Sequence, residues 1–256
     1  MVALFHRIYG DKQPAIIIAH GLFGMADNWH NIAQKLQESH QVITVDLRNH
    51  GHSPHHPDMS YADMVADLLA LIMDLNLEKP ILVGHSMGGK LMMHFAALHP
   101  QHVSKLVIVD IASKAYPKGH EIYFTALFEL TKTTVSSRSE AQHILEKFVK
   151  DPAILQFLLK SLYRTSEGTY KLRMNVEAIY QHYDEIRSAV HFDWPVSVPT
   201  LFVKGENSNY IEPEDEHAIS EMFTDVQIES IQNAGHWLHA DNPAAFIQTL
   251  QQFLLS

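Results

Sequence analysis

A serine framed by glycines is the feature of the sequence with the clearest chemistry. Residues 80–89 read Pro-Ile-Leu-Val-Gly-His-Ser-Met-Gly-Gly, and a helical pattern over 90–98 follows at once. A buried strand, a tight glycine turn and a helix, in that order, are what a nucleophile elbow requires. Gly84 and Gly88 would remove steric clashes on both sides of Ser86, whose hydroxyl then lies at a helix N-terminus that favours negative charge. We therefore predict that Ser86 is a nucleophile.

A serine hydroxyl needs a neighbouring base to take its proton, and histidine is the usual base. Among the 19 histidines of the chain, His236 is distinctive because Ala-Gly-His-Trp at 234–237 follows the last predicted strand. The loop there returns to the carboxyl edge of the predicted sheet, where Ser86 is also expected and where open α/β sheets bind ligands. We predict that His236 is the general base.

An acid that orients the imidazole has two candidates. Asp110 ends a predicted strand beside the serine strand, which would place its carboxylate at the same edge. The more common position in such folds follows the next-to-last strand, but there Ser208 stands where an aspartate is often found, and Glu206 is the acid in that turn. We predict Asp110 as the acid, with Glu206 as the alternative.

Two backbone N–H groups are expected to bind the oxyanion of a tetrahedral intermediate. One belongs to Met87, the residue after the nucleophile. The other comes from the glycine-containing loop at 20–24, where we favour the N–H of Leu22 over that of Phe23. The side chains of Phe23 and Trp237 are predicted to contact the substrate.

The elements that must position these residues alternate along the chain. Runs that are apolar throughout, such as 16–18 and 106–109, predict strands buried on both faces, as in a parallel sheet covered by helices. A capping box at 60–63 starts a helix that reaches about residue 76. This alternation predicts an α/β fold with a doubly wound, mostly parallel sheet. Strands are predicted near residues 4–9, 15–19, 41–46, 81–84, 106–110, 200–204 and 226–231.

The alternation stops over residues 113–192. This stretch contains several helical patterns and no convincing strand, and Asp-Trp-Pro at 193–195 then returns the chain to the sheet. We predict a helical cap over 113–192, inserted into a core formed by 1–112 and 193–256. Cap side chains that suit either an acyl pocket or the core of the cap are Phe124, Leu127, Phe128, Leu158 and Tyr180.

Composition limits the partners. Lysine and arginine number 19 against 29 acidic residues, a net charge of −10, which disfavours nucleic acid and anionic membranes as partners. The chain has no cysteine, no phosphate-binding glycine motif and no signal-peptide pattern. We therefore expect a cytoplasmic enzyme that acts on a small molecule without a cofactor.

Four histidines at 50, 52, 55 and 56 raise a metal site as an alternative. Metal sites need ligands that converge from fixed spacings, and a loop rich in proline and glycine supplies these poorly. We predict no metal ion here and interpret the segment as a loop organised by Arg48.

Several segments together resemble the α/β-hydrolase superfamily and, within it, the YbfF-type bacterial esterases. They are His-Gly-Leu-Phe-Gly at 20–24 with Asn-Trp at 28–29, Asp-Leu-Arg-Asn-His-Gly-His-Ser at 46–53, Gly-His-Ser-Met-Gly-Gly-Lys at 84–90, Val-Asp-Ile-Ala at 109–112 and Gly-His-Trp at 235–237. The pieces Arg-Asn-His-Gly, Ser-Met-Gly-Gly-Lys and Gly-x-Asn-Ser-x-Tyr at 205–210 are more specific than the superfamily signature. The resemblance runs nearly end to end and is weakest in the cap.

The resemblance implies a cofactor-free serine hydrolase with the α/β-hydrolase fold. Its implied substrates are short- to medium-chain acyl esters, which makes it a carboxylesterase, with acyl-CoA thioesters as a further class. In that subgroup the acid follows the strand that carries Asp110. Ser113 and Lys114 stand where the family often has a proline, so the start of the cap departs from the pattern.

Two other functions are compatible with these residues. Hydrolysis of a C–C bond in a diketone-type substrate uses the same triad on this fold. A non-catalytic module that binds a small ligand could also retain the pocket, although such modules usually lose part of the catalytic set. Ser86 argues against dehalogenase and epoxide-hydrolase chemistry, which need an aspartate nucleophile.

Overall fold

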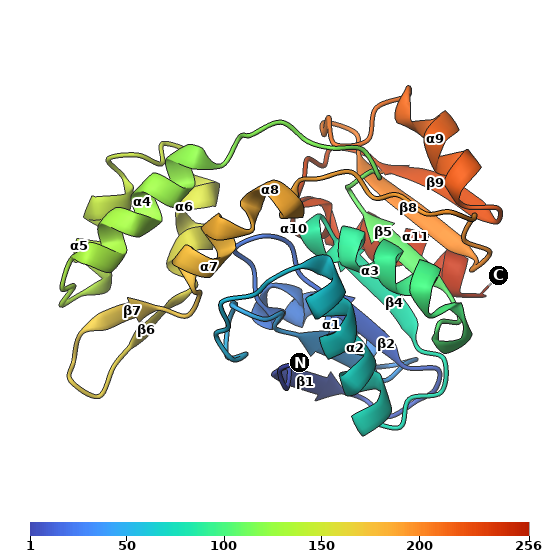
Figure 1. Cartoon of the computed structure of the whole chain (residues 1–256), viewed down its shortest axis with the longest axis horizontal. Helices are drawn as coiled ribbons and strands as arrows, with labels where there is room; N and C mark the ends of the chain where they lie inside the picture. Colours follow the sequence, from blue (N-terminus) through green and yellow to red (C-terminus); the bar gives the residue numbers. More distant parts are fainter. Residues whose placement is uncertain (256) are drawn as a thin grey trace.

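The structure, a computed structural model, describes residues 1–255 and contains a seven-stranded sheet in the order β1-β3-β2-β4-β5-β8-β9 (Figure 1). β1 pairs antiparallel with β3, and the other strand pairs of this sheet are parallel. The mostly parallel sheet predicted from the sequence is thereby confirmed. Its strands are β1 (His6–Tyr9), β2 (Ile16–Ala19), β3 (Val42–Val45), β4 (Ile81–His85), β5 (Leu106–Val109), β8 (Thr200–Gly205) and β9 (Val226–Ile231).

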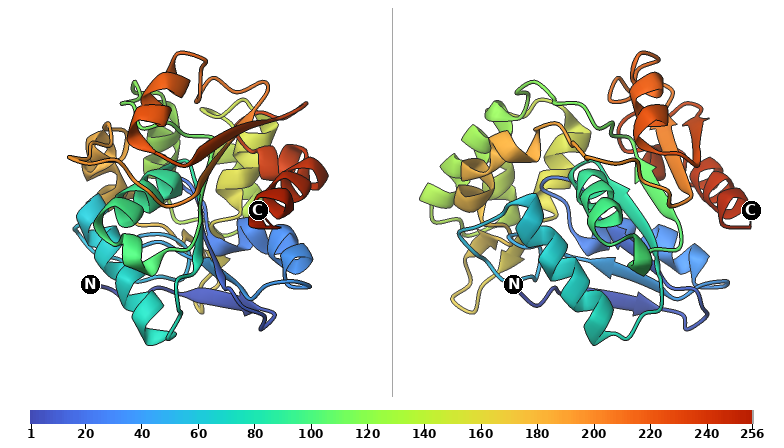
Figure 2. Two further views of the ribbon diagram at one scale, coloured as in Figure 1. Left: turned by 90° about the vertical axis from the view of Figure 1, so that its right-hand side faces the viewer. Right: turned by 45° about the vertical axis from the view of Figure 1, so that its right-hand side comes forward.

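Helices cover both faces of the sheet, as a doubly wound fold requires. Ile16 and Ile18 of β2 face the cluster that includes α1 (His30–Leu36) and α11 (Pro243–Leu255). Ile17 faces the opposite cluster, which includes α2 (Tyr61–Asp74), α3 (Met87–Leu98) and α9 (Asp215–Met222). The left view of Figure 2 shows the blue α1 and red α11 on one side of the sheet and the teal-to-green α2 and α3 on the other. Shorter elements are η1 (Ala26–Trp29), η2 (Pro100–His102) and α10 (Leu238–Asp241).

The segment between β5 and β8 forms a separate group of helices beside the sheet (Figure 1). Its helices are α4 (Glu121–Lys132), α5 (Arg138–Leu145), α6 (Pro152–Leu159), α7 (Val176–Gln181) and α8 (Tyr183–Ile186). Across the described residues 1–255, no helix has both the length and the apolar character needed to cross a membrane.

One expectation for this segment is wrong, because it also contains a β-hairpin. β6 (Leu162–Arg164) pairs antiparallel with β7 (Tyr170–Leu172). α6, the helix that precedes the hairpin, ends at Leu159. Each strand has only three residues and mixed exposure, so neither carries the alternating apolar pattern that identifies a strand.

Candidate active site

Ser86 occupies a strained turn at the carboxyl end of β4. Its backbone angles are φ 53° and ψ −117°, and α3 begins at the next residue. A Cβ on Gly84 would lie 2.3 Å from the carbonyl oxygen of Gly88, and a Cβ on Gly88 would lie 2.6 Å from that of His20. Glycine at both positions therefore allows β4, the turn at Ser86 and the loop at 20–24 to approach one another, as a nucleophile elbow requires.

Gly84→Ala is expected to lower the free energy of unfolding by about 3 kcal/mol, because backbone atoms of Gly88 occupy the space that the methyl group needs. Urea denaturation measures the change. Gly119→Ala is the matched control, since a Cβ there would meet no atom within 4 Å. Similar stabilities of the two variants would contradict the tight packing of the turn.

His236 and Asp110 form a direct pair at the carboxyl edge of the sheet. The Nδ1–H of His236 donates to Oδ2 of Asp110 at 2.7 Å, and Asp110 is fully buried. The carboxylate also accepts the N–H of Gly205 at 3.0 Å and the hydroxyl of Ser208 at 2.5 Å. Because Nδ1 carries the donated proton, Nε2 of His236 is the nitrogen that can accept a proton from a serine.

The structure brings Asp110, and not Glu206, to the imidazole. Glu206 Oε2 instead accepts the backbone N–H of Asn233 at 2.8 Å at an exposed position. Ser208 occupies the position where the sequence suggested a missing aspartate, and its hydroxyl binds Asp110 rather than His236. The sequence analysis singled out Ser208 as a replacement for an aspartate but did not predict its hydrogen bond to Asp110.

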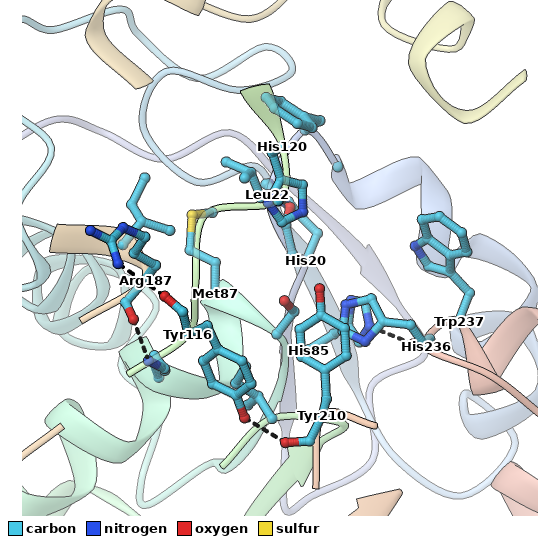
Figure 3. A pocket seen from close by; sticks show the side chains of 18 of the residues that line it. His20, Leu22, His85, Met87, Tyr116, His120, Arg187, Tyr210, His236 and Trp237 are labelled. Atoms are coloured by element: carbon cyan, nitrogen blue, oxygen red, sulfur yellow. Dashed lines mark hydrogen bonds between the residues drawn. The ribbon is translucent and has the colours of Figure 1, made fainter. Parts of the chain in front are cut away.

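Ser86 and His236 border one cavity of about 560 Å³, shown in Figure 3. Among residues 1–255, Ser86 Oγ has no hydrogen-bond partner, and its side chain is partly exposed to the cavity. Hydrogen bonds between a nucleophile and its base are often long without substrate and shorten in the reacting complex. The arrangement therefore leaves the serine hydroxyl free to meet a substrate.

His85 links the nucleophile turn to the loop that carries His236. Its Nε2–H donates to the backbone carbonyl of His236 at 2.8 Å, and the two rings lie 4.6 Å apart. Burial holds the pKa of His85 well below its ordinary value, so its imidazole is neutral. This contact was not predicted, because nothing in the elbow motif indicates where the variable residue before Ser86 points.

The two predicted oxyanion donors both border the cavity. The backbone N–H groups of Leu22 and Met87 have no acceptor within residues 1–255. The N–H of Phe23 donates to Nε2 of His50 at 3.3 Å and is therefore already occupied. The structure thus favours Leu22 over Phe23 as the second donor, which is also the preference drawn from the sequence.

His20 is hydrogen-bonded through both ring nitrogens to the backbone around the loop at 20–24. Its Nδ1–H donates to the carbonyl of Gly21 at 2.8 Å, and its Nε2 accepts the N–H of Leu47 at 3.0 Å. Burial lowers the pKa of His20 to about 4, which keeps it neutral. With both ring nitrogens bonded to the backbone, His20 is not placed to act as a second base.

One group of apolar side chains in the cavity lining, the apolar end, comes from α6 and from the loop between β9 and α10. The apolar end is formed by Ile154, Phe157, Leu158 and Trp237, and the rings of Phe157 and Trp237 lie 5.5 Å apart. Phe23 and Tyr116 also border the cavity. Of the cap side chains considered for the acyl pocket, Leu158 borders the cavity, whereas Phe124, Leu127, Phe128 and Tyr180 do not. The ring of Phe124 instead lies 5.1 Å from that of Phe23, and Tyr180 contacts Phe124 and Phe128.

The four cationic side chains at the cavity border all form ion pairs or hydrogen bonds. They are Lys90, Lys114, Lys118 and Arg187. Their carboxylate partners, at 2.7 to 3.5 Å, are Glu212 and Asp215 for Lys114 and Asp184 for both Lys118 and Arg187. The buried Nζ of Lys90 donates to the backbone carbonyls of Lys114, Arg187 and Ser188. Among the described residues, Lys90 is thus the one cation of these four without a carboxylate partner, and its buried Nζ directs its N–H donors to backbone carbonyls.

The histidine-rich segment is organised around Arg48. Nε of the fully buried Arg48 lies 2.7 Å from Oδ2 of Asp67, and a terminal nitrogen lies 2.9 Å from Oδ1. Nδ1 of His50 donates to the carbonyl of Arg48, and Nε2 of His55 donates to that of Arg173, each at 3.0 Å. These ring nitrogens bind separate backbone carbonyls rather than pointing to a common centre.

Arg48→Met is expected to lower the free energy of unfolding by about 3–5 kcal/mol, because it leaves the buried carboxylate of Asp67 without its cationic partner. Urea denaturation monitored by tryptophan fluorescence measures the loss. The control is Arg7→Met, whose exposed ion pair with Asp27 is expected to contribute less than about 1 kcal/mol. Equal losses in the two variants would be inconsistent with this role of Arg48.

A doubly wound sheet with a serine at a strand–helix turn, beside a histidine–aspartate pair, defines the α/β-hydrolase class. A family model described as alpha/beta hydrolase fold matches residues 14–124. The chain is 39% identical, over 98% of its length and 84% of the relative, to the mouse protein named sn-1-specific diacylglycerol lipase ABHD11. It is 34% identical, over 95% of its length and 93% of the relative, to esterase YbfF of Escherichia coli.

A solved structure named as a marine microorganism esterase is 40% identical to the chain, with a TM-score of 0.94. The match covers 99% of this chain and 100% of that structure's chain. The chain therefore belongs to the α/β-hydrolase family, which confirms the family predicted from the sequence.

Proposed function

We propose that this α/β hydrolase is a serine carboxylesterase that cleaves neutral, short- to medium-chain acyl esters through an acyl-enzyme on Ser86. The observation that carries the proposal is the pair of His236 and Asp110 beside the strained Ser86, all at one edge of the sheet. Similar proteins named esterase and lipase support an ester-cleaving enzyme. Residues 113–192 serve as the cap, because they supply the apolar end of the cavity together with Trp237.

The proposed reaction passes through two tetrahedral intermediates. Oγ of Ser86 attacks the acyl carbon while Nε2 of His236 takes the hydroxyl proton, and the carboxylate of Asp110 holds Nδ1–H in place. The carbonyl oxygen becomes negative and accepts the N–H groups of Leu22 and Met87. Collapse breaks the bond to the alcohol, which leaves with the proton from His236. Water then attacks the acyl-enzyme in the same way, releasing the carboxylic acid and restoring the serine.

A neutral substrate is favoured by the charges around the cavity. Three of the four cations at its border are paired with carboxylates, and the fourth, Lys90, is buried with its donors bound to backbone carbonyls, so few free cationic groups face the phosphates of coenzyme A. The apolar end, by contrast, suits an acyl chain. We therefore rank simple esters above acyl-CoA thioesters as substrates.

Hydrolysis of p-nitrophenyl esters from acetate to palmitate tests the proposal. We expect turnover that is highest for short or medium chains, and a lower kcat/KM for butyryl-CoA than for p-nitrophenyl butyrate. Turnover of a coloured dienoate C–C substrate without ester turnover would instead favour the diketone-type hydrolase.

Labelling with a fluorophosphonate probe separates an enzyme from a ligand-binding module. The probe reacts with activated serines, so we expect one label per chain, on a peptide that contains Ser86. Absence of both labelling and ester turnover would favour the non-catalytic module.

A further inference from the structure

The aromatic ring of Tyr210 lies flat against the imidazole of His236. The ring centroids are 3.8 Å apart and the planes differ by 16°. Figure 3 shows the Tyr210 ring over that of His236, with its hydroxyl directed towards the cavity. That hydroxyl has no hydrogen-bond partner within residues 1–255. Tyr210 therefore contacts His236 through the face of its aromatic ring and not through its hydroxyl.

The backbone of Tyr210 is fixed on both sides of this ring. Its N–H donates to Oγ of Ser208 at 3.3 Å, and its carbonyl accepts the hydroxyl of Tyr116 at 2.6 Å. The same Tyr116 oxygen accepts the N–H of Ala112 at 2.8 Å. Since Ser208 also binds Asp110, the segment that orients His236 through Asp110 also positions the Tyr210 ring.

The surroundings of His236 contain one acidic side chain in contact and several neutral ones. Asp110 binds Nδ1, and the rings of His85 and Tyr210 contact the imidazole. His120 and His239 lie close enough to interact with it electrostatically. Burial lowers the pKa of His120 to about 4 and that of His239 to about 3, and holds that of His85 well below its ordinary value. Burial raises the pKa of Tyr210 to about 12. These four groups therefore remain neutral while His236 gains and loses its proton.

We propose that Tyr210 is a positioning residue that holds the plane of the His236 imidazole and stabilises its cationic form through the face of the aromatic ring. The negative face of an aromatic ring attracts a cation placed over it. His236 becomes a cation each time it takes a proton from serine or water, so the stabilisation applies when the tetrahedral intermediates form. The inference rests on the proposed function for its catalytic consequence, but the contact itself can be tested without substrate.

NMR titration of the His236 imidazole tests the contact directly. The His236→Gln variant identifies the signal among the histidines. Tyr210→Leu should move the titration midpoint of His236 to lower pH by about 0.4–0.7 units, because the cation loses the ring face. Tyr210→Phe is the matched variant, since it retains the ring and loses a hydroxyl without a partner; its midpoint should stay near that of the wild type.

A second substitution covers the case in which Tyr210→Leu does not fold. Pentafluorophenylalanine at position 210 keeps about the shape of the phenylalanine variant but makes the ring face partially positive, so it should lower the midpoint at least as far as leucine does. Kinetics then measure the consequence. We expect kcat to fall about three- to tenfold in the leucine and pentafluoro variants relative to Tyr210→Phe, with KM nearly unchanged.

Midpoints that coincide in the phenylalanine and pentafluorophenylalanine proteins would overturn the proposal, because a residue that only fills space is indifferent to ring charge. A shifted midpoint in a protein that hydrolyses no ester would refute the proposed function while leaving the contact between Tyr210 and His236 intact.

Discussion

Ser86→Ala is expected to lower kcat for p-nitrophenyl butyrate by about 10⁴- to 10⁶-fold. The methyl group cannot attack the acyl carbon, so only the oxyanion donors and substrate binding remain to accelerate direct attack by water. Steady-state hydrolysis with a protein concentration high enough to detect the residual rate measures the loss. Fluorophosphonate labelling should disappear in the same variant.

The stability of Ser86→Ala distinguishes lost chemistry from lost structure. Alanine fits the same positive-φ backbone about as well as serine, and Oγ has no hydrogen-bond partner within the described chain, so unfolding in urea should change little. Ser166→Ala, in the exposed loop between β6 and β7, is the matched control and should retain full activity. Substantial turnover by the Ser86 variant would show that another group attacks the ester.

The features that could be predicted from the sequence are those whose residue types dictate the local backbone. Strands such as β2 and β5 are buried along their whole length, and this burial leaves uninterrupted apolar runs that any reader of the sequence can find. The glycines around Ser86 predicted a tight turn correctly, because the turn leaves no room for a side chain at Gly84 or Gly88. Local sterics therefore account for the success of these predictions.

The features that the sequence left with an alternative, or did not reveal, depend on contacts between distant segments. The choice between Asp110 and Glu206 follows from which carboxylate reaches His236, 126 residues along the chain from Asp110. His85 and Tyr210 flank the same imidazole from β4 and from the loop after β8, and neither position has a local pattern that reveals its direction. The short hairpin failed for a different reason, because three-residue strands carry too little periodicity to recognise.

Asp110→Asn is expected to lower kcat/KM for p-nitrophenyl butyrate by about 10⁴-fold. The amide NH₂ can donate to Nδ1 of His236, which stabilises the tautomer with the proton on Nε2, and that tautomer cannot accept the proton of Ser86. The remaining partners of Asp110 strengthen this expectation. The N–H of Gly205 donates to Oδ1, whereas Oδ2 faces both the imidazole and the Ser208 hydroxyl. An asparagine amide oxygen at the Oδ1 position keeps the bond from Gly205 and presents the NH₂ to the imidazole, and the Ser208 hydroxyl can rotate to accept from the same NH₂.

Glu206→Gln is the matched control, and its kcat/KM should remain within about twofold of the wild type, as for most exposed substitutions away from a site. Glu206 accepts the N–H of Asn233, and the glutamine amide oxygen can keep this bond. Ester kinetics at a fixed pH on both variants decide the assignment, because the two acids make opposite predictions. A large loss in Glu206→Gln with a nearly normal Asp110→Asn would require that the loop after β8 rearranges during catalysis to exchange one carboxylate for the other. A large loss in Asp110→Asn alone would show that the hydrogen bond between Asp110 and His236 orients the base during turnover.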